Sequence, residues 1–222
     1  PLVQKLLIPW IIPKKEFVKF GINSKNITHY KAIDASIIAK RKVSKNSKKL
    51  DKENKRKMIL VRVEEEYASY STKKRPAIPI LREIIKNFCD EEIVVMGRYI
   101  SQVKQLDQTF GKKIRVLSKV VDSKTLLENS DIFIGSGGTM TAESALLGIP
   151  TISYNAIPNI IESYLVRKKL VVRETNPKHI VRSIRKIFES SNLTIKKKSK
   201  KMLNSMEDPY PILVKTIKSV LK

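Results

Sequence analysis

The chain has 222 residues, of which 41% are hydrophobic and 30% are charged. This is enough apolar material for a core, so a wholly disordered chain is excluded, and 7 glycines and 10 prolines exclude a collagen-like or linker-like composition. A single cysteine, Cys89, excludes an internal disulfide framework and a multi-cysteine zinc site, and its apolar helical surroundings predict a buried thiol. His29 and His179 lie far apart in the sequence, which argues against a histidine-based metal site. We therefore expect neither a metal nor a cofactor.

The net charge is +24, from 45 basic and 21 acidic residues. Such an excess can attract nucleic acid, anionic lipid or phosphorylated substrates. However, lysines outnumber arginines by 34 to 11, whereas bidentate recognition of bases and phosphates relies on arginine. The sequence also has no recognisable nucleic-acid module and no aromatic residues interleaved with basic ones. The charge therefore favours a solvated lysine-rich surface, and electrostatic binding of nucleic acid or an anionic membrane surface remains the alternative.

The first 39 residues indicate a small separate unit, with an amphipathic helix at 14–20 that ends at Gly21 and a short strand at 27–30. The apolar run 6–12 is too short to span a bilayer, which needs about 20 residues. Because no signal peptide opens the chain, we expect a cytoplasmic protein with peripheral membrane contact as a further option. The chain begins at Pro1 rather than Met, so we also expect a fragment or a processed product.

Residues 40–57 contain ten basic and two acidic residues without apolar periodicity, which is typical of a linker. From 58 to 193, short apolar runs alternate with helical stretches. Strands are predicted at 58–63, 93–96, 114–117, 131–134, 150–154 and 170–173, and helices at 78–88, 123–129, 141–147, 159–168 and 177–188. This alternation predicts an α/β fold, a Rossmann-like parallel sheet with helices on both faces. Residues 194–222 are expected to form one or two helices.

Four of the seven glycines fall within fourteen residues, where an apolar strand runs into Gly135-Ser-Gly-Gly and a helix follows. Glycines allow the backbone to turn tightly and approach a ligand, and the free N–H groups of a first helical turn attract anions. Ser136, Thr139 and Thr141 add hydroxyls that could contact phosphate or cap the helix. In a parallel sheet this loop lies at the carboxyl edge, where ligands bind. A tight structural turn is the alternative interpretation.

Glu143 follows Gly138 by five residues, in the second turn of that helix. A carboxylate there is poorly placed for phosphate but well placed to accept hydrogen bonds from ribose hydroxyls. The alternative is that Glu143 only complements the helix dipole. The spacing is neither the dinucleotide fingerprint GxGxxG nor a P-loop, because no lysine follows the glycines.

The stretch GSGGTMTAESALLGIPTISY at 135–154 resembles the nucleotide-binding signature of the GT-B superfamily, which includes UDP-N-acetylglucosamine 2-epimerases and the lipid-linked GlcNAc transferase of peptidoglycan synthesis. Its GGTM-x-x-E form is most similar to that of an uncharacterised, mainly archaeal family of unknown function. The resemblance extends to VRVEEEYASYS at 61–71, VMGR at 95–98 and the approach at 122–131, and it includes IIPKKEFVKFGI and THYKAID near the N-terminus.

This resemblance implies a C-terminal nucleotide-sugar domain at 58–193, preceded by the remnant of a first GT-B domain at 1–39. By that likeness the phosphate contacts are Ser136, Gly137, Gly138 and Thr139, followed by Met140 of the GGTM motif, with Glu143 as the ribose ligand. Arg62 resembles an arginine on the phosphate side, although Val61 stands where the epimerases have histidine, and Gly97 gives close approach at the next strand end.

The implied partner is a nucleotide-diphosphate sugar, UDP-GlcNAc or a related UDP-sugar, and the implied activity is that of a glycosyltransferase or an epimerase. A lipid-linked acceptor at an anionic membrane surface is a further implied partner. Most of the first domain is absent, so no catalytic acid or base is assigned.

Several other residues have two interpretations each. Tyr154, Asn155 and Pro158 could line a sugar pocket or only form a loop. Tyr67 and Tyr70 could stack on a base, but cover of the sheet is favoured. The acidic run 64–66 could hold a divalent ion, but a solvated run is favoured.

Overall fold

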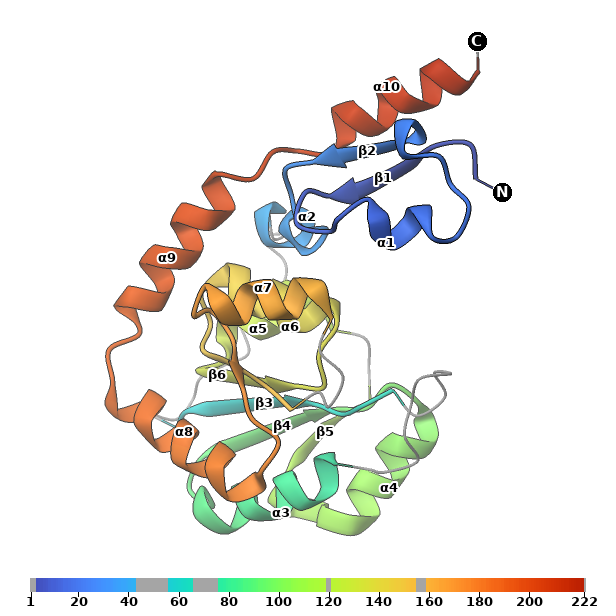
Figure 1. Cartoon of the computed structure of the whole chain (residues 1–222). Coiled ribbons are helices and arrows are strands. Elements are labelled where there is room, and N and C mark those ends of the chain that lie inside the picture. Colours follow the sequence, from blue (N-terminus) through green and yellow to red (C-terminus); the bar gives the residue numbers. More distant parts are fainter. Residues whose placement is uncertain (1–2, 43–55, 66–75, 119–120, 155–158, 222) are drawn as a thin grey trace.

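The computed structural model describes residues 3–42, 56–65, 76–118, 121–154 and 159–221 (Figure 1). Its centre is a six-stranded sheet of order β5-β4-β3-β6-β7-β8 in which every pairing is parallel. The strands are β3 (Met58–Arg62), β4 (Glu92–Met96), β5 (Arg115–Leu117), β6 (Ile132–Gly135), β7 (Thr151–Ser153) and β8 (Val172–Arg173). The predicted α/β class with a parallel sheet is confirmed, and its likeness to Rossmann-type domains is clear.

Helices cover both faces of this sheet, as continuously apolar strands require. Even-numbered residues of β3 such as Leu60 pack toward α5 (Ser123–Asn129) and α6 (Thr139–Leu147). Odd-numbered residues such as Ile59 and Val61 pack toward α3 (Ala77–Asn87), α4 (Ile100–Phe110) and α8 (Pro177–Glu189). Figure 1 shows these two helical layers on opposite sides of the strands, with α7 (Ile160–Arg167) beside α6.

The sequence analysis assigned no element to residues 98–113, where the structure has helix α4. Its apolar residues Val103, Leu106 and Phe110 do follow helical spacing, but polar residues separate them. The prediction of a buried thiol at Cys89 is wrong, because this residue lies just beyond the end of α3 and is exposed. The amphipathic pattern of that helix buries Leu81 and Ile84 and does not extend to Cys89.

The N-terminal unit contains a second, two-stranded parallel sheet, formed by β1 (Leu6–Pro9) and β2 (Ile27–Tyr30). It also contains α1 (Lys15–Val18), the 3-10 turn η1 (Ser24–Asn26) and α2 (Ala35–Lys40). The apolar run 6–12 thus supplies a strand that the sequence did not predict.

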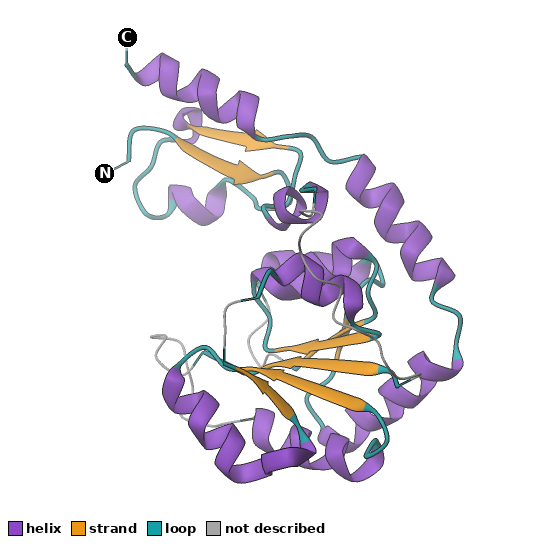
Figure 2. Ribbon diagram, turned by 180° about the vertical axis from the view of Figure 1, so that it is seen from behind, coloured by secondary structure: helices purple, strands orange, loops and turns teal. Residues whose placement is uncertain are grey.

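The C-terminal helices connect the two units. Helix α9 (Leu193–Asn204) packs along α6, where the Ser199 hydroxyl donates a 2.7 Å hydrogen bond to the Ala145 carbonyl oxygen. The chain then returns to the N-terminal unit, where the Glu207 N–H donates to the Lys31 carbonyl oxygen at 3.0 Å. Helix α10 (Tyr210–Val220) follows on the side of the N-terminal unit (Figure 2), and its Ile212 packs against the apolar cluster that includes Tyr30 of β2. None of the helices in the described segments is long and apolar enough to cross a bilayer.

Candidate functional site at the carboxyl edge of the sheet

The glycine-rich segment forms a backbone loop between β6 and α6. Gly137 and Gly138 adopt φ of +88° and +83°, a region that side chains rarely allow. Gly138 caps α6 from the N-terminal side, and no side chain in the described part of the chain caps that helix end. Gly138 and Thr139 are exposed, so the N–H groups of the first turn are accessible to an anion.

Gly135 is required for a different reason, because it is closely packed. A Cβ at this position would lie 2.6 Å from the Phe133 ring and 2.9 Å from the Thr141 hydroxyl oxygen. The Thr141 side chain therefore lies under the loop. Its hydroxyl is buried and has no hydrogen-bond partner among the described residues. The predicted turn is thus closely packed where it starts, at Gly135, and exposed to solvent where it ends, at Gly138 and Thr139.

The sheet register brings a positive charge to this loop. Arg62 is the last residue of β3, and it pairs with Gly135 on one side and with Met96 on the other. Burial, followed by repulsion from Arg98, lowers the pKa of the Arg62 guanidinium, while Glu143 and Glu65 act in the opposite direction. The Arg62 Nε is buried without a partner among the described residues. Two arginines therefore lie near each other at the carboxyl edge, with Glu143 and Glu65 as nearby opposite charges.

Met140 contacts the same arginine rather than facing outward. Its sulfur accepts a 3.1 Å hydrogen bond from an Arg62 terminal nitrogen, and the Met140 side chain is buried. Gly97 packs against helix α4, since an added Cβ would lie 2.9 Å from the Val103 side chain. Met140 thus contacts Arg62 and Gly97 contacts α4, and a role of either residue in ligand binding stays a prediction.

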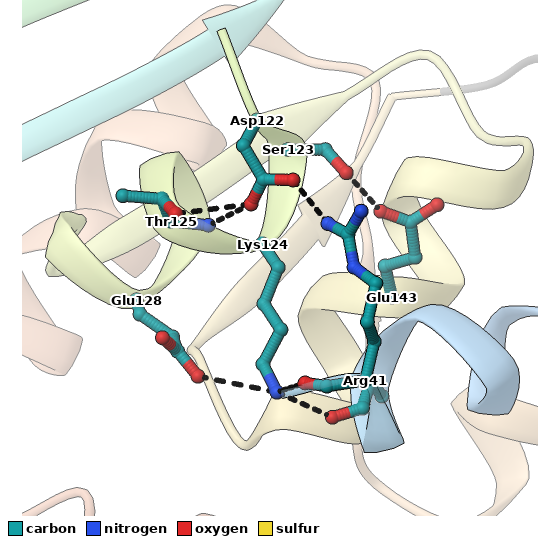
Figure 3. Close-up of polar contacts among 8 residues, drawn as sticks. Arg41, Asp122, Ser123, Lys124, Thr125, Glu128 and Glu143 are labelled. Carbon is teal, nitrogen blue, oxygen red and sulfur yellow. Dashed lines mark hydrogen bonds and ion pairs between the residues drawn. The ribbon is translucent and has the colours of Figure 1, made fainter. Parts of the chain in front are cut away.

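Glu143 lies on the flank of α6 that faces α5, and it is 6% exposed. Its Oε2 accepts a 2.9 Å hydrogen bond from the Ser123 hydroxyl. Figure 3 shows that Arg41 reaches over from the end of α2 toward this carboxylate and bonds to Asp122. The sequence analysis did not assign Ser123 a role, because its partner Glu143 lies twenty positions further along the chain.

Lys124 joins the N-terminal unit to this part of the site. Its ammonium donates to the Ala39 and Arg41 carbonyl oxygens at 2.8 and 2.5 Å, and it lies 3.7 Å from a Glu128 oxygen (Figure 3). The lysine thereby supplies hydrogen bonds to carbonyls at the end of α2, a place where cations are favoured. Residues 39–41 are thus fixed to the start of α5.

Residues at or just beyond the ends of β3 and β7 contact each other. Tyr154 is 2% exposed, and its hydroxyl lies 2.9 Å from the Arg62 carbonyl oxygen and 3.1 Å from a Glu64 oxygen. Burial, and then Glu64, raises the pKa of Tyr154. This tyrosine is not among the described residues that line the cavity beside the loop.

The acidic run is also not simply solvated. Glu64 accepts a 3.3 Å hydrogen bond from the Ala77 N–H, and Glu65 bonds to Tyr99 and lies 3.6 Å from Arg98. In the described parts of the chain, no three His, Cys, Asp or Glu side chains form a group that could hold a metal ion. Glu66, Tyr67, Tyr70, Asn155 and Pro158 lie outside the described residues.

A cavity of about 520 Å³ adjoins the exposed end of the loop. It lies between the N-terminal unit and the N-terminal ends of α6 and α7, and Gly138 and Thr139 form part of its wall. The site therefore has three parts side by side: the arginine-flanked loop, the Glu143 flank and this cavity.

Solved structures show which fold the chain resembles. It superposes on Staphylococcus aureus MnaA, solved with UDP, with a TM-score of 0.74 and 17% identity over 99% of this chain and 60% of that chain. The UDP-GlcNAc 2-epimerase of Methanocaldococcus jannaschii, solved with UDP-GlcNAc and UDP, gives 0.64 and 16% over 86% and 56%. The Neisseria meningitidis UDP-GlcNAc 2-epimerase gives 0.63 and 16% over 98% and 62%. The fold is therefore that of the GT-B Rossmann-like proteins.

Sequence comparison gives the family. The model of DUF354, a protein of unknown function, matches residues 1–222, and the chain belongs to this family. An uncharacterised protein of M. jannaschii, MJ0665, is 30% identical over 157 residues, which are 70% of this chain and 42% of that protein. The chain thus spans less than half of this curated relative and about 56–62% of the solved chains named above. The predicted resemblance to GT-B proteins and to an uncharacterised archaeal family is confirmed.

Proposed function

We propose that this chain binds a nucleotide-diphosphate sugar, with a UDP-sugar as the first candidate, and that it is the nucleotide-binding part of a glycosyltransferase or a sugar epimerase. The observation that carries this proposal is the loop of two positive-φ glycines at the start of α6, beside Arg62 and Arg98. It is supported by the ligands of the similar structures, UDP in MnaA and UDP-GlcNAc in the two UDP-GlcNAc 2-epimerases.

The diphosphate is the group that this loop suits. Phosphate oxygens at the exposed N–H groups of Gly138 and Thr139 would meet the positive end of the α6 dipole. The Arg62 and Arg98 guanidinium groups would add charge-assisted hydrogen bonds and would be relieved of their mutual repulsion. The role of Ser136 is to supply a hydroxyl at the same turn.

The ribose is assigned to the Glu143 flank. In this proposal the Glu143 carboxylate accepts hydrogen bonds from the ribose hydroxyls, and Ser123 holds it in place through the 2.9 Å hydrogen bond. Because Glu143 is 6% exposed, the diol would approach along the rim between α5 and α6.

The proposal also divides the chain into domains. Residues 58–193 form the nucleotide-sugar domain, 40–57 the basic linker, and 1–39 a remnant of the other GT-B domain, to which 194–222 return. The residues described above bind and orient a ligand, and catalytic groups are not assigned to any of them.

Calorimetry with UDP and UDP-GlcNAc on the full chain tests the proposal. Gly138→Asp would place a carboxylate where phosphate sits, and since like charges about 4 Å apart repel strongly, affinity should fall by at least about 100-fold. Gly138→Ala is the matched control. An added Cβ has open space around it, so this variant reports only the backbone strain of the Gly138 conformation, φ +83° and ψ −165°, at about 1–3 kcal/mol. Equal binding by Gly138→Asp and wild type would refute the loop assignment, and failure of both ligands to bind wild type would refute the function.

An electrostatic role is the second candidate, because α9 exposes a run of lysines at 196–198 and 200–201. These charges would attract an anionic membrane surface, and a lipid-linked acceptor with it. Liposome flotation with and without anionic lipid tests this role, and it should fail above about 0.5 M salt, where the Debye length is only a few Å. Flotation that is independent of both lipid charge and salt would contradict it.

A further inference from the structure

The cavity beside the loop is built from two separate parts of the chain. Phe17, Ile33 and Asp34 contribute from the N-terminal unit, while Ile161 and Leu165 contribute from α7. Gly138 and Thr139 close the wall between them, and a volume of about 520 Å³ is in the range of pockets for small ligands. A group attached to a phosphate at the loop would therefore enter the cavity directly.

The charges around the cavity are opposite in sign to those of the molecule as a whole. Glu16, Asp34 and Glu162 line it, and none of the lining residues within the described segments is a lysine or an arginine, although the chain carries a net charge of +24. Lys19 pairs with Glu16 at 2.9 Å and offsets part of that charge. The Asp34 carboxylate accepts a hydrogen bond from the Tyr30 hydroxyl, which orients it.

The two flanks of α6 therefore differ in chemistry. The flank of Glu143 faces α5 and lies next to Arg62 and its cationic neighbour. The flank of Thr139 and Ala142 faces α7 and the acidic, largely apolar cavity. The loop lies between these flanks, so a diphosphate bound there would separate a nucleoside on one side from a substituent on the other.

We infer that this cavity is the subsite for the sugar of the nucleotide sugar, and that it selects an uncharged or amino sugar over one that carries a carboxylate. This inference rests on the proposed function and adds the substrate class. Carboxylates accept hydrogen bonds from hydroxyl and ammonium groups, the apolar walls cover the C–H faces of the ring, and a sugar carboxylate would be repelled by Asp34 and Glu162.

Binding of UDP, UDP-glucose and UDP-glucuronate to the full chain tests this. The two sugars differ only in having a hydroxymethyl or a carboxylate group, and the overall charge of +24 by itself favours the more anionic ligand. If the inference holds, UDP-glucose binds at least about threefold more tightly than UDP-glucuronate, which is the opposite order. This factor follows from the repulsion between the glucuronate carboxylate and one cavity carboxylate about 6 Å away, even in a water-like dielectric. Asp34→Asn should narrow this ratio without changing the affinity for UDP. Asp107→Asn, an exposed carboxylate on α4, is the matched control and should leave the ratio unchanged.

Each outcome separates the two claims. If UDP binds but the two UDP-sugars bind equally, in wild type and in Asp34→Asn, the subsite assignment is overturned and the proposed function stands. If UDP-glucuronate binds more tightly, the charge argument is overturned in the same way. If UDP itself does not bind, the proposed function fails, and this inference fails with it. The ratio of the wild-type affinities for UDP-glucose and UDP-glucuronate tests the inference by itself. The inference can therefore be refuted even if the Asp34→Asn variant does not fold.

Discussion

Replacing Arg62 by methionine should weaken ligand binding without destabilising the ligand-free protein. In the structure the Arg62 Nε is a buried donor without a partner among the described residues, and such a group costs about 1–3 kcal/mol. Burial, followed by repulsion from Arg98, lowers the pKa of the Arg62 guanidinium, so the charged form is disfavoured in the folded protein. Methionine keeps the apolar stem and removes the orphaned donor and the charge. The free energy of unfolding should therefore stay the same or rise by up to about 2 kcal/mol.

The same change should reduce UDP affinity by about 10- to 150-fold, because a hydrogen bond to a charged group contributes about 1.5–3 kcal/mol. Urea unfolding gives the stability and calorimetry gives the affinity, with Arg82→Met on the exposed side of α3 as the control that should change neither. Loss of more than about 1 kcal/mol of stability, together with UDP affinity within twofold of wild type, would refute the reasoning. Arg62 would then be a structural residue and not a ligand-binding one.

Three further substitutions test the frame that holds the site. Gly135→Ala should lower the free energy of unfolding by about 1–3 kcal/mol, because its Cβ would lie 2.6 Å from the Phe133 ring; a change within 0.5 kcal/mol in urea unfolding would contradict this packing. The Thr125 N–H, ahead of other contacts, holds the pKa of Asp122 below its usual value, so this carboxylate stabilises the fold above about pH 4 and loses its contribution as the pH falls through the lowered pKa. Asp122→Asn keeps a capping oxygen, but the urea midpoint of this variant should fall less than that of wild type as the pH is lowered from about 6 to about 2.5. The same pH dependence in variant and wild type would contradict the contribution of the Asp122 carboxylate. Lys124→Met should cost about 1.5–3 kcal/mol by thermal or urea unfolding, since two carbonyl oxygens lose a charged donor, and Lys124→Arg should cost less; equal stability of Lys124→Met and wild type would contradict the link to α2.

Local signals in the sequence are enough to predict much of the sheet and the loop. The strand at β2 and the helix at α5 have the predicted bounds, and the helix predicted at 177–188 is α8. The prediction of a glycine turn between an apolar strand and a helix needs only the sequence, because the two positive-φ glycines and the following helical stretch are adjacent in the chain.

Features that depend on contacts between distant residues could not be predicted in this way. Helix α4 has a narrow apolar stripe, and its buried Gln102 is accommodated because it accepts a hydrogen bond from the Arg98 N–H and donates to the Glu64 carbonyl oxygen. Strand β1 is four residues long and is defined by pairing with β2. Likewise, the contact of Ser123 with Glu143 joins residues twenty positions apart, so no local pattern reveals it.

The most direct test of the central claim is to follow backbone amide resonances of the isotope-labelled chain as UDP is added. If the loop binds the diphosphate, the largest shift changes will be at Gly137, Gly138 and Thr139, with smaller changes near Arg62 and Glu143. Saturable changes confined to the lysine-rich helix α9, with the loop resonances unmoved, would contradict the account.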